Sequence, residues 1–118
     1  MAIVEVSIVP IGIPTTSLSP YVVRALEVLR QSRLGYELTA MGTIISGDLD
    51  EIWPVLKQMH ESCFETPEVA RVLTQIKVDD RRDRLASPAQ KVGSVMDKLR
   101  HSGLAVEGEP SATTEQQR

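Results

Sequence analysis

The segment from Arg71 to Arg81 constrains the fold more than any other stretch of this 118-residue chain. Its apolar and polar side chains alternate, which is the pattern of a β-strand with two different faces. One face would carry Val72, Thr74, Ile76 and Val78, and the other Leu73, Gln75, Lys77 and Asp79. The sequence therefore predicts a sheet with one apolar face for a core. Its other face is mixed and can bind a ligand or a partner.

Other segments show strand or helix patterns in a definite order. Strand patterns also cover Ala2–Val9, Tyr36–Met41 and Thr43–Ser46. A helix is predicted from Ser19, as its N-cap, to a stop at Gly35. A second helix is predicted from the cap Asp50, with an inner apolar stripe that reaches Cys63, in a region that ends at Thr66-Pro67. The residues Ser87-Pro88-Ala89-Gln90 fit a capping box, which predicts a third helix that ends at Gly103.

The order of these elements predicts the α+β class. It is the order of a ferredoxin-like βαββαβ sandwich with an antiparallel four-stranded sheet, here with an added C-terminal helix. Right-handed crossovers would place both main helices on one face, above the stripes Val4/Val6/Ile8 and Val72/Ile76/Val78. We expect residues 1–104 to form a single domain, and residues 105–118, which offer almost nothing to bury, to form a disordered tail.

The opposite face of the predicted sheet would stay open unless a second subunit covered it. Its expected residues include Glu5, Ser7, Val9, Thr39, Met41, Gln75 and Lys77. The apolar side chains of Ile3, Val9, Met41 and Leu73 would add to it and favour a sheet-to-sheet contact between copies. We therefore expect a homo-oligomer, either a dimer or a tetramer.

Composition excludes several classes of function. A formal net charge of −3 argues against nucleic-acid binding, which usually needs a basic face. Aromatic residues make up only 3% of the chain, so stacking platforms for single-stranded RNA are missing. No apolar run is long enough to span a bilayer, and the N-terminus lacks a secretory signal. A single cysteine favours a reducing compartment, so the cytoplasm is the expected location.

Several short segments together resemble a known family. They are Ile3–Gly12, Met41-Gly42-Thr43, Gly47–Glu51, His60-Glu61 and Arg71–Arg81. Their order and spacing are similar to those of a family of thiamine-binding proteins, over about Ile3 to Leu99. The resemblance implies ferredoxin-like subunits that pair into dimers and tetramers. It also implies that the protein binds thiamine or its hydroxymethylpyrimidine moiety. The family is not linked to a demonstrated reaction.

One position departs from the family pattern. The chain has Ser46 where the resemblance predicts an acidic residue. If the acidic residue contacts the ligand in relatives, this chain, which lacks it, would bind the ligand more weakly. If the acidic residue only lies on the surface of a hairpin, its replacement by serine would not change ligand affinity.

The candidate ligand-binding residues are those whose chemistry matches thiamine, which carries an aminopyrimidine and a cationic thiazolium ring. A carboxylate, hydroxyl groups and a soft apolar wall would suit these rings. The residues of these types on neighbouring segments are Glu5, Ser7, Thr39, Met41 and Thr43. The alternatives are ordinary strand positions for Ser7 and Thr39, and a cross-strand ion pair of Glu5 with Lys77. Trp53 would either stack on a ligand or fill the edge of the core.

Catalytic and metal-binding residues are not predicted. Asp79, Asp80 and Asp83 lie among three arginines, which compete with a metal ion. His60 and Cys63 share one side of a helix, but two ligands make a poor zinc site. No nucleophile has an adjacent base, and no cofactor motif is present. The first hypothesis is therefore a non-enzymatic binder of thiamine or its pyrimidine. The alternatives are an amino-acid-type regulatory sensor and a cofactor-free enzyme of the same fold.

Overall fold

The computed structural model describes residues 1–83 and 88–103. The elements are β1 (Ala2–Pro10), α1 (Ser19–Arg30), β2 (Gly35–Leu38), β3 (Thr43–Gly47), α2 (Leu49–Ser62), a 3₁₀ turn (Cys63–Glu65), β4 (Val72–Asp80) and α3 (Pro88–His101). This order confirms the predicted α+β, ferredoxin-like fold with a C-terminal helix. The chain forms two compact units, Met1–Leu85 and Ala86–Arg118. A single domain over residues 1–104 stays a prediction, and the predicted tail lies outside the described residues.

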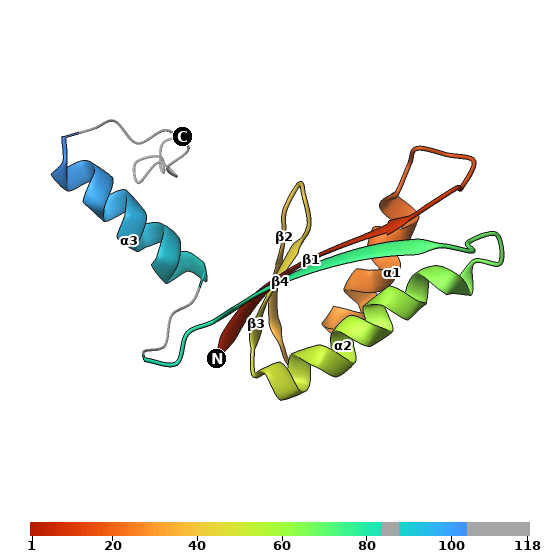
Figure 1. Cartoon of the computed structure of the whole chain (residues 1–118), viewed down its shortest axis with the longest axis horizontal. Helices are drawn as coiled ribbons and strands as arrows, with labels where there is room; N and C mark the ends of the chain where they lie inside the picture. The colour runs from red at the N-terminus through yellow and green to blue at the C-terminus, as the bar shows by residue number, and fades with distance from the viewer. Residues whose placement is uncertain (84–87, 104–118) are drawn as a thin grey trace. The chain divides into compact units, whose positions relative to one another are not determined.

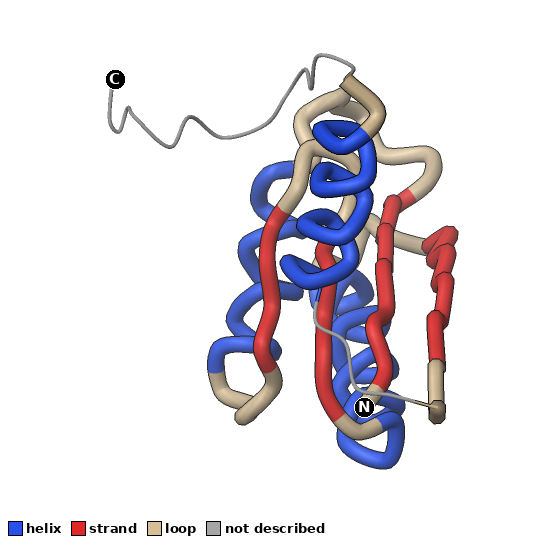
Figure 2. The backbone as a smooth tube through the Cα atoms, turned by 90° about the vertical axis from the view of Figure 1, so that its left-hand side faces the viewer, coloured by secondary structure: helices blue, strands red, loops and turns tan. Residues whose placement is uncertain are grey.

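The first unit is built on one antiparallel sheet with the strand order β2-β3-β1-β4. Figure 2 shows the strands side by side as red tubes. β1 is paired on both sides, so Val4 lies opposite Ile45 of β3 and Val78 of β4. Cross-strand partners point to the same face of a sheet. The register therefore assigns every strand residue to one of two faces.

Helices α1 and α2 cover one of these faces (Figure 1). The core beneath them combines Val4 and Val6 of β1, Ile45 of β3, Ala25 and Leu29 of α1, and Ile52, Leu56 and Met59 of α2. The other face, which we call the open face, carries no helix among residues 1–83. Its side chains are Ile3, Glu5, Ser7 and Val9 of β1, Glu37 of β2, Ile44 and Ser46 of β3, and Leu73, Gln75, Lys77 and Asp79 of β4.

The apolar stripe of β4 lies on the predicted face but is covered less than expected. Ile76 lies opposite Val6 and Val78 opposite Val4, as an inward-facing stripe requires. Ile76 is nevertheless 38% exposed and Val78 41% exposed. β4 is an edge strand, and α2 packs mainly over β1 and β3. A contact between α2 and β4 is made by His60, whose Nδ1 lies 2.6 Å from the Thr74 hydroxyl.

Element boundaries correct several sequence predictions. Ser19 is already helical, because the N-cap of α1 is Leu18, and the helix ends at Arg30 rather than at Gly35. The cap of α2 is Asp48 instead of Asp50, and its side chain accepts a hydrogen bond from the Asp50 amide. In both cases the true cap lies one or two residues before the predicted one.

Asp48, the cap of α2, and Ser19, the first residue of α1, should differ in their effect on stability. Asp48→Ala removes a carboxylate that accepts the Asp50 amide at 2.9 Å, so the free energy of unfolding should fall by about 0.5–2 kcal/mol. Ser19→Ala is the matched control, because α1 begins without a side-chain cap bond. That variant should change stability by less than about 0.5 kcal/mol. Urea denaturation of both variants measures the difference, and equal losses would contradict the cap assignment.

The second unit is described by its helix α3. The predicted third helix is confirmed, and Gly103, at φ +81°, adopts the left-handed conformation typical of a helix stop. The proposed cap Ser87 lies outside the described residues. Over residues 1–83 and 88–103, the helices lack the length and apolar character needed to cross a membrane.

Candidate functional site

A cluster of polar side chains lies on the open face where β1 pairs with β4. Glu5 lies directly opposite Lys77, and Ser7 lies opposite Gln75. The Lys77 Nζ is 3.3 Å from the Glu5 Oε1, so the predicted cross-strand ion pair is present. Both side chains reach solvent, and Lys77 is much the more exposed of the two. These four residues, which we call the polar quartet, place a carboxylate, an ammonium, a hydroxyl and an amide side by side.

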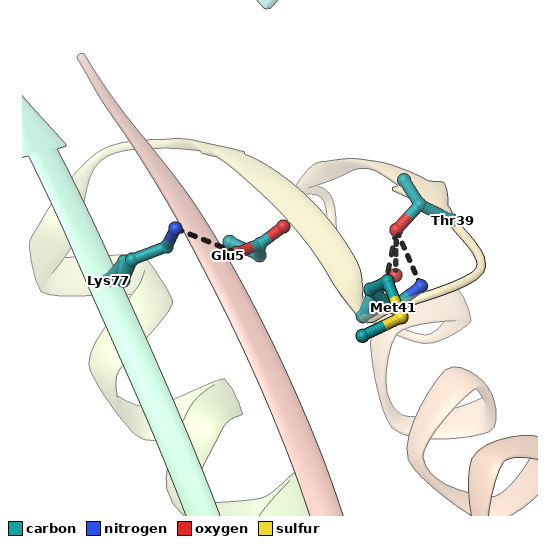
Figure 3. A network of polar contacts seen from close by, with 5 residues as sticks. Glu5, Thr39, Met41 and Lys77 are labelled. Atoms are coloured by element: carbon teal, nitrogen blue, oxygen red, sulfur yellow. Dashed lines mark hydrogen bonds and ion pairs between the residues drawn. The ribbon is translucent and has the colours of Figure 1, made fainter.

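The turn between β2 and β3 lies beside the polar quartet (Figure 3). The Thr39 hydroxyl donates to the Gly42 carbonyl at 2.8 Å and accepts the amides of Met41 and Gly42. β2 therefore stops at Leu38, and the predicted strand Tyr36–Met41 is too long. A Cβ on Gly42 would lie 2.8 Å from the Val6 carbonyl oxygen, so only glycine lets the turn approach β1 this closely. The turn leaves the Met41 side chain almost fully exposed.

Two hollows meet at this turn. The outer hollow, of about 600 Å³, is lined by Glu5, Ser7, Met41, Gln75, Ile76 and Lys77. The inner pocket, of about 170 Å³, lies between β1, the turn and α1. Ser7 and Met41 line both. The outer hollow lies within the range of roughly 300–1,000 Å³ that is common for small-molecule sites.

The candidate ligand-binding residues are all found around these hollows. Glu5 lines the outer hollow, Thr39 and Thr43 line the inner pocket, and Ser7 and Met41 line both. Thr39 and Met41 lie in the turn rather than on a strand of the open face. Thr43 pairs with Val6 and is buried on the helix-covered side. The structure therefore arranges these residues on both sides of the turn instead of on one surface.

Two residues that line these hollows were not among the candidate ligand-binding residues predicted from the sequence. Gln75 was expected on the open face, but its position directly opposite Ser7 places it in the outer hollow. Tyr21 of α1 lines the inner pocket and was not singled out. Ser46, the position that departs from the family pattern, lies opposite Ile3 and lines neither hollow.

The other residues considered from sequence lie elsewhere. Trp53 is half-exposed on α2 rather than packed into the core edge. Arg82 donates to Asp80, and this hydrogen bond lowers the pKa of the Asp80 carboxyl. Cys63 is buried, and its burial raises the pKa of the thiol against the opposing effect of Arg24. The described part of the chain contains no group of three side chains able to hold a metal ion.

The fold and the two hollows define a small ferredoxin-like α+β protein with a ligand-sized recess beside an uncovered sheet face. The sequence model of the family described as thiamine-binding protein matches residues 4–96 of this chain. The chain therefore belongs to the thiamine-binding protein family, as the resemblance predicted. Membership in this family indicates that the protein binds a small molecule.

Several relatives support this assignment. A UPF0045 protein of Methanothermobacter thermautotrophicus is 39% identical over 100 residues, covering 84% of this chain and 100% of that protein. The UPF0045 protein YqgV of Bacillus subtilis is 38% identical over 99 residues, covering 80% of this chain and 94% of that protein.

Solved structures share the fold. A hypothetical protein of Methanocaldococcus jannaschii has a TM-score of 0.74 at 36% identity, covering 81% of this chain and 96% of that one. A candidate thiamine biosynthesis/salvage protein of Thermotoga maritima has a TM-score of 0.65 at 20% identity, covering 80% and 97%. The second likeness concerns the fold alone.

Proposed function

We propose that this protein is a non-enzymatic binder of thiamine or its hydroxymethylpyrimidine moiety, and that the ligand binds beside the β2–β3 turn, with the cationic ring of thiamine in the outer hollow against the open face. The observation that carries this proposal is the carboxylate of Glu5 in a hollow of about 600 Å³, in a chain of the thiamine-binding family. A carboxylate is the side chain best suited to a cationic ring or an exocyclic amino group.

The remaining residues of the hollow complement the same ligand. The Ser7 hydroxyl and the Gln75 amide both donate and accept hydrogen bonds, so they complement the polar substituents of such a ligand. The Met41 thioether supplies a polarisable wall for a ring. Lys77 competes with a cationic ligand for Glu5, but its bond to Glu5 is solvent-exposed and therefore weak. A bound cation can displace it at little cost.

A homo-oligomer is the proposed working form, either a dimer or a tetramer. Ile3, Val9 and Leu73 place apolar side chains on the open face around the polar quartet. A second copy that covered this face would bury them and enclose the outer hollow. The cytoplasm is the proposed location, in keeping with a chain whose one cysteine is a buried thiol.

Thermal melting with added ligands tests the proposed function. At a ligand concentration about 100-fold above the dissociation constant, a ligand of the native state adds about 2.7 kcal/mol of stability. Thiamine and hydroxymethylpyrimidine should therefore each raise the melting midpoint by several degrees.

Amino acids, tested in parallel, should leave the midpoint unchanged. A shift with amino acids alone would favour the regulatory-sensor alternative. No shift with millimolar thiamine or pyrimidine would contradict the proposed function.

A further inference from the structure

The inner pocket beneath the β2–β3 turn has the size of a single ring. Its volume is about 170 Å³. A cavity of about 150 Å³ in another protein is known to hold a benzene molecule, so this pocket has room for one six-membered ring. Most of its wall is apolar and comes from both layers of the fold: Val6 and Ile8 of β1, Val22 and Ala25 of α1, Leu38 of β2 and Met59 of α2.

Two hydroxyl groups in this apolar wall have no hydrogen-bond partner within the part of the protein that the structure describes. Tyr21 of α1 and Thr43 of β3 both line the pocket, and each residue is only 7% exposed. Among residues 1–83 and 88–103, neither hydroxyl makes a hydrogen bond within the protein. Ser62 shows the usual arrangement, because its buried hydroxyl donates to the Met59 carbonyl at 2.6 Å. Buried polar groups nearly always form a hydrogen bond, so two unpaired hydroxyls at one pocket indicate that the pocket binds a polar ligand.

We propose that the inner pocket holds the neutral six-membered heteroaromatic ring of the ligand, an aminopyrimidine, with the Tyr21 and Thr43 hydroxyls bonded to its nitrogens. The inference rests on the proposed function and adds the orientation of the ligand. The apolar side chains of the pocket contact the two faces of the ring. The two hydroxyls form the hydrogen bonds that the ring nitrogens make with water before binding.

The charges in the two hollows set the orientation. Burying a cation without a counter-charge is costly, and the lining of the inner pocket contains no carboxylate. Glu5 lies in the outer hollow instead. A ligand with a neutral ring and a cationic ring would therefore place the neutral ring inside and the cation outside. Ser7 and Met41 line both hollows and would contact the bridge between the rings.

The test is calorimetric titration of hydroxymethylpyrimidine and of thiamine into wild type, Tyr21→Phe and Thr43→Val. Each variant keeps the shape of the side chain and removes one hydroxyl. Each should bind both compounds roughly tenfold more weakly. The unliganded melting midpoint should stay unchanged or rise, since a buried unpaired hydroxyl is lost. Loss of an ordinary structural hydroxyl would instead lower it.

Tyr36→Phe is the matched control, because Tyr36 is a half-exposed tyrosine of β2 that lines neither hollow. It should bind both compounds as wild type does. If Tyr21→Phe and Thr43→Val also bind as wild type while Glu5→Gln weakens thiamine binding, the inner pocket is not the ring site but the proposed function stands. If wild type binds neither compound, both proposals fail.

A second measurement keeps the inference testable if a variant does not fold. Methyl NMR of the wild-type protein with hydroxymethylpyrimidine alone should shift the methyl signals of Ala25 and Thr43. Shifts confined to residues of the outer hollow would overturn the assignment.

Discussion

Replacing Leu29 with alanine should lower the free energy of unfolding by about 2–5 kcal/mol. Leu29 is 0% exposed and belongs to the central cluster in which α1 and α2 meet the sheet. Alanine would remove apolar contacts and leave a cavity that helices packed on a sheet cannot fully close. For a protein of this size, the loss is a large share of the total stability. Urea denaturation followed by circular dichroism measures it as a lower transition midpoint with an unchanged slope.

Val23→Ala is the control on the same helix. Val23 is 57% exposed, so the same kind of truncation removes little buried surface. Its effect should stay within about 0.5 kcal/mol. Similar losses for both variants would mean that α1 does not pack with Leu29 facing the core.

The main elements of the fold could be predicted because their residue patterns are strong and local. Alternation identified β1 and β4, and the stripe containing Leu26 and Leu29 identified α1. Helix starts were less accurate. Ser19-Pro20 suits a cap followed by a first helical residue, but the helix begins one residue earlier, at the cap Leu18. Leu18 makes no side-chain cap bond, so no polar residue in the sequence marks this helix start.

The candidate site could be predicted only where it depends on alternation along β1 and β4. Glu5 and Lys77 were expected on one face, and the register places them directly opposite each other. The position of Met41 depends on a turn held by the Thr39 hydroxyl and on the close approach of Gly42 to Val6. The approach of Gly42 to Val6 joins segments far apart in the chain, and no local pattern encodes it.

The side of the sheet on which Thr43 lies also could not be read from the sequence. A shift of one residue in strand register moves a side chain to the opposite face. The turn ends at Gly42, so Thr43 is the first residue of β3 and faces the core beside Val6. Tyr21 was missed because a tyrosine on the apolar face of a helix is usually an ordinary core residue, and the sequence does not show whether its hydroxyl is paired. Only the folded structure reveals that its hydroxyl has no hydrogen-bond partner among residues 1–83 and 88–103.

Glu5→Gln should weaken thiamine binding roughly 10- to 150-fold, because a hydrogen bond to a charged group contributes about 1.5–3 kcal/mol. Glutamine keeps the shape of the side chain but cannot balance a cation. The stability of the unliganded protein should change by no more than about 1 kcal/mol, since the pair with Lys77 is exposed. Calorimetric titration and urea denaturation of the same samples separate the two effects.

Lys77→Met distinguishes a ligand contact from a purely structural ion pair. This variant removes the ammonium 3.3 Å from Glu5 and leaves the carboxylate free for a cationic ligand. Thiamine binding should therefore strengthen, by up to roughly fivefold if the exposed pair contributes about 1 kcal/mol. The two substitutions thus have opposite expected effects on affinity although they break the same ion pair. If both weakened binding equally, the pair itself would be the required feature, and Glu5 would support the sheet instead of contacting the ligand.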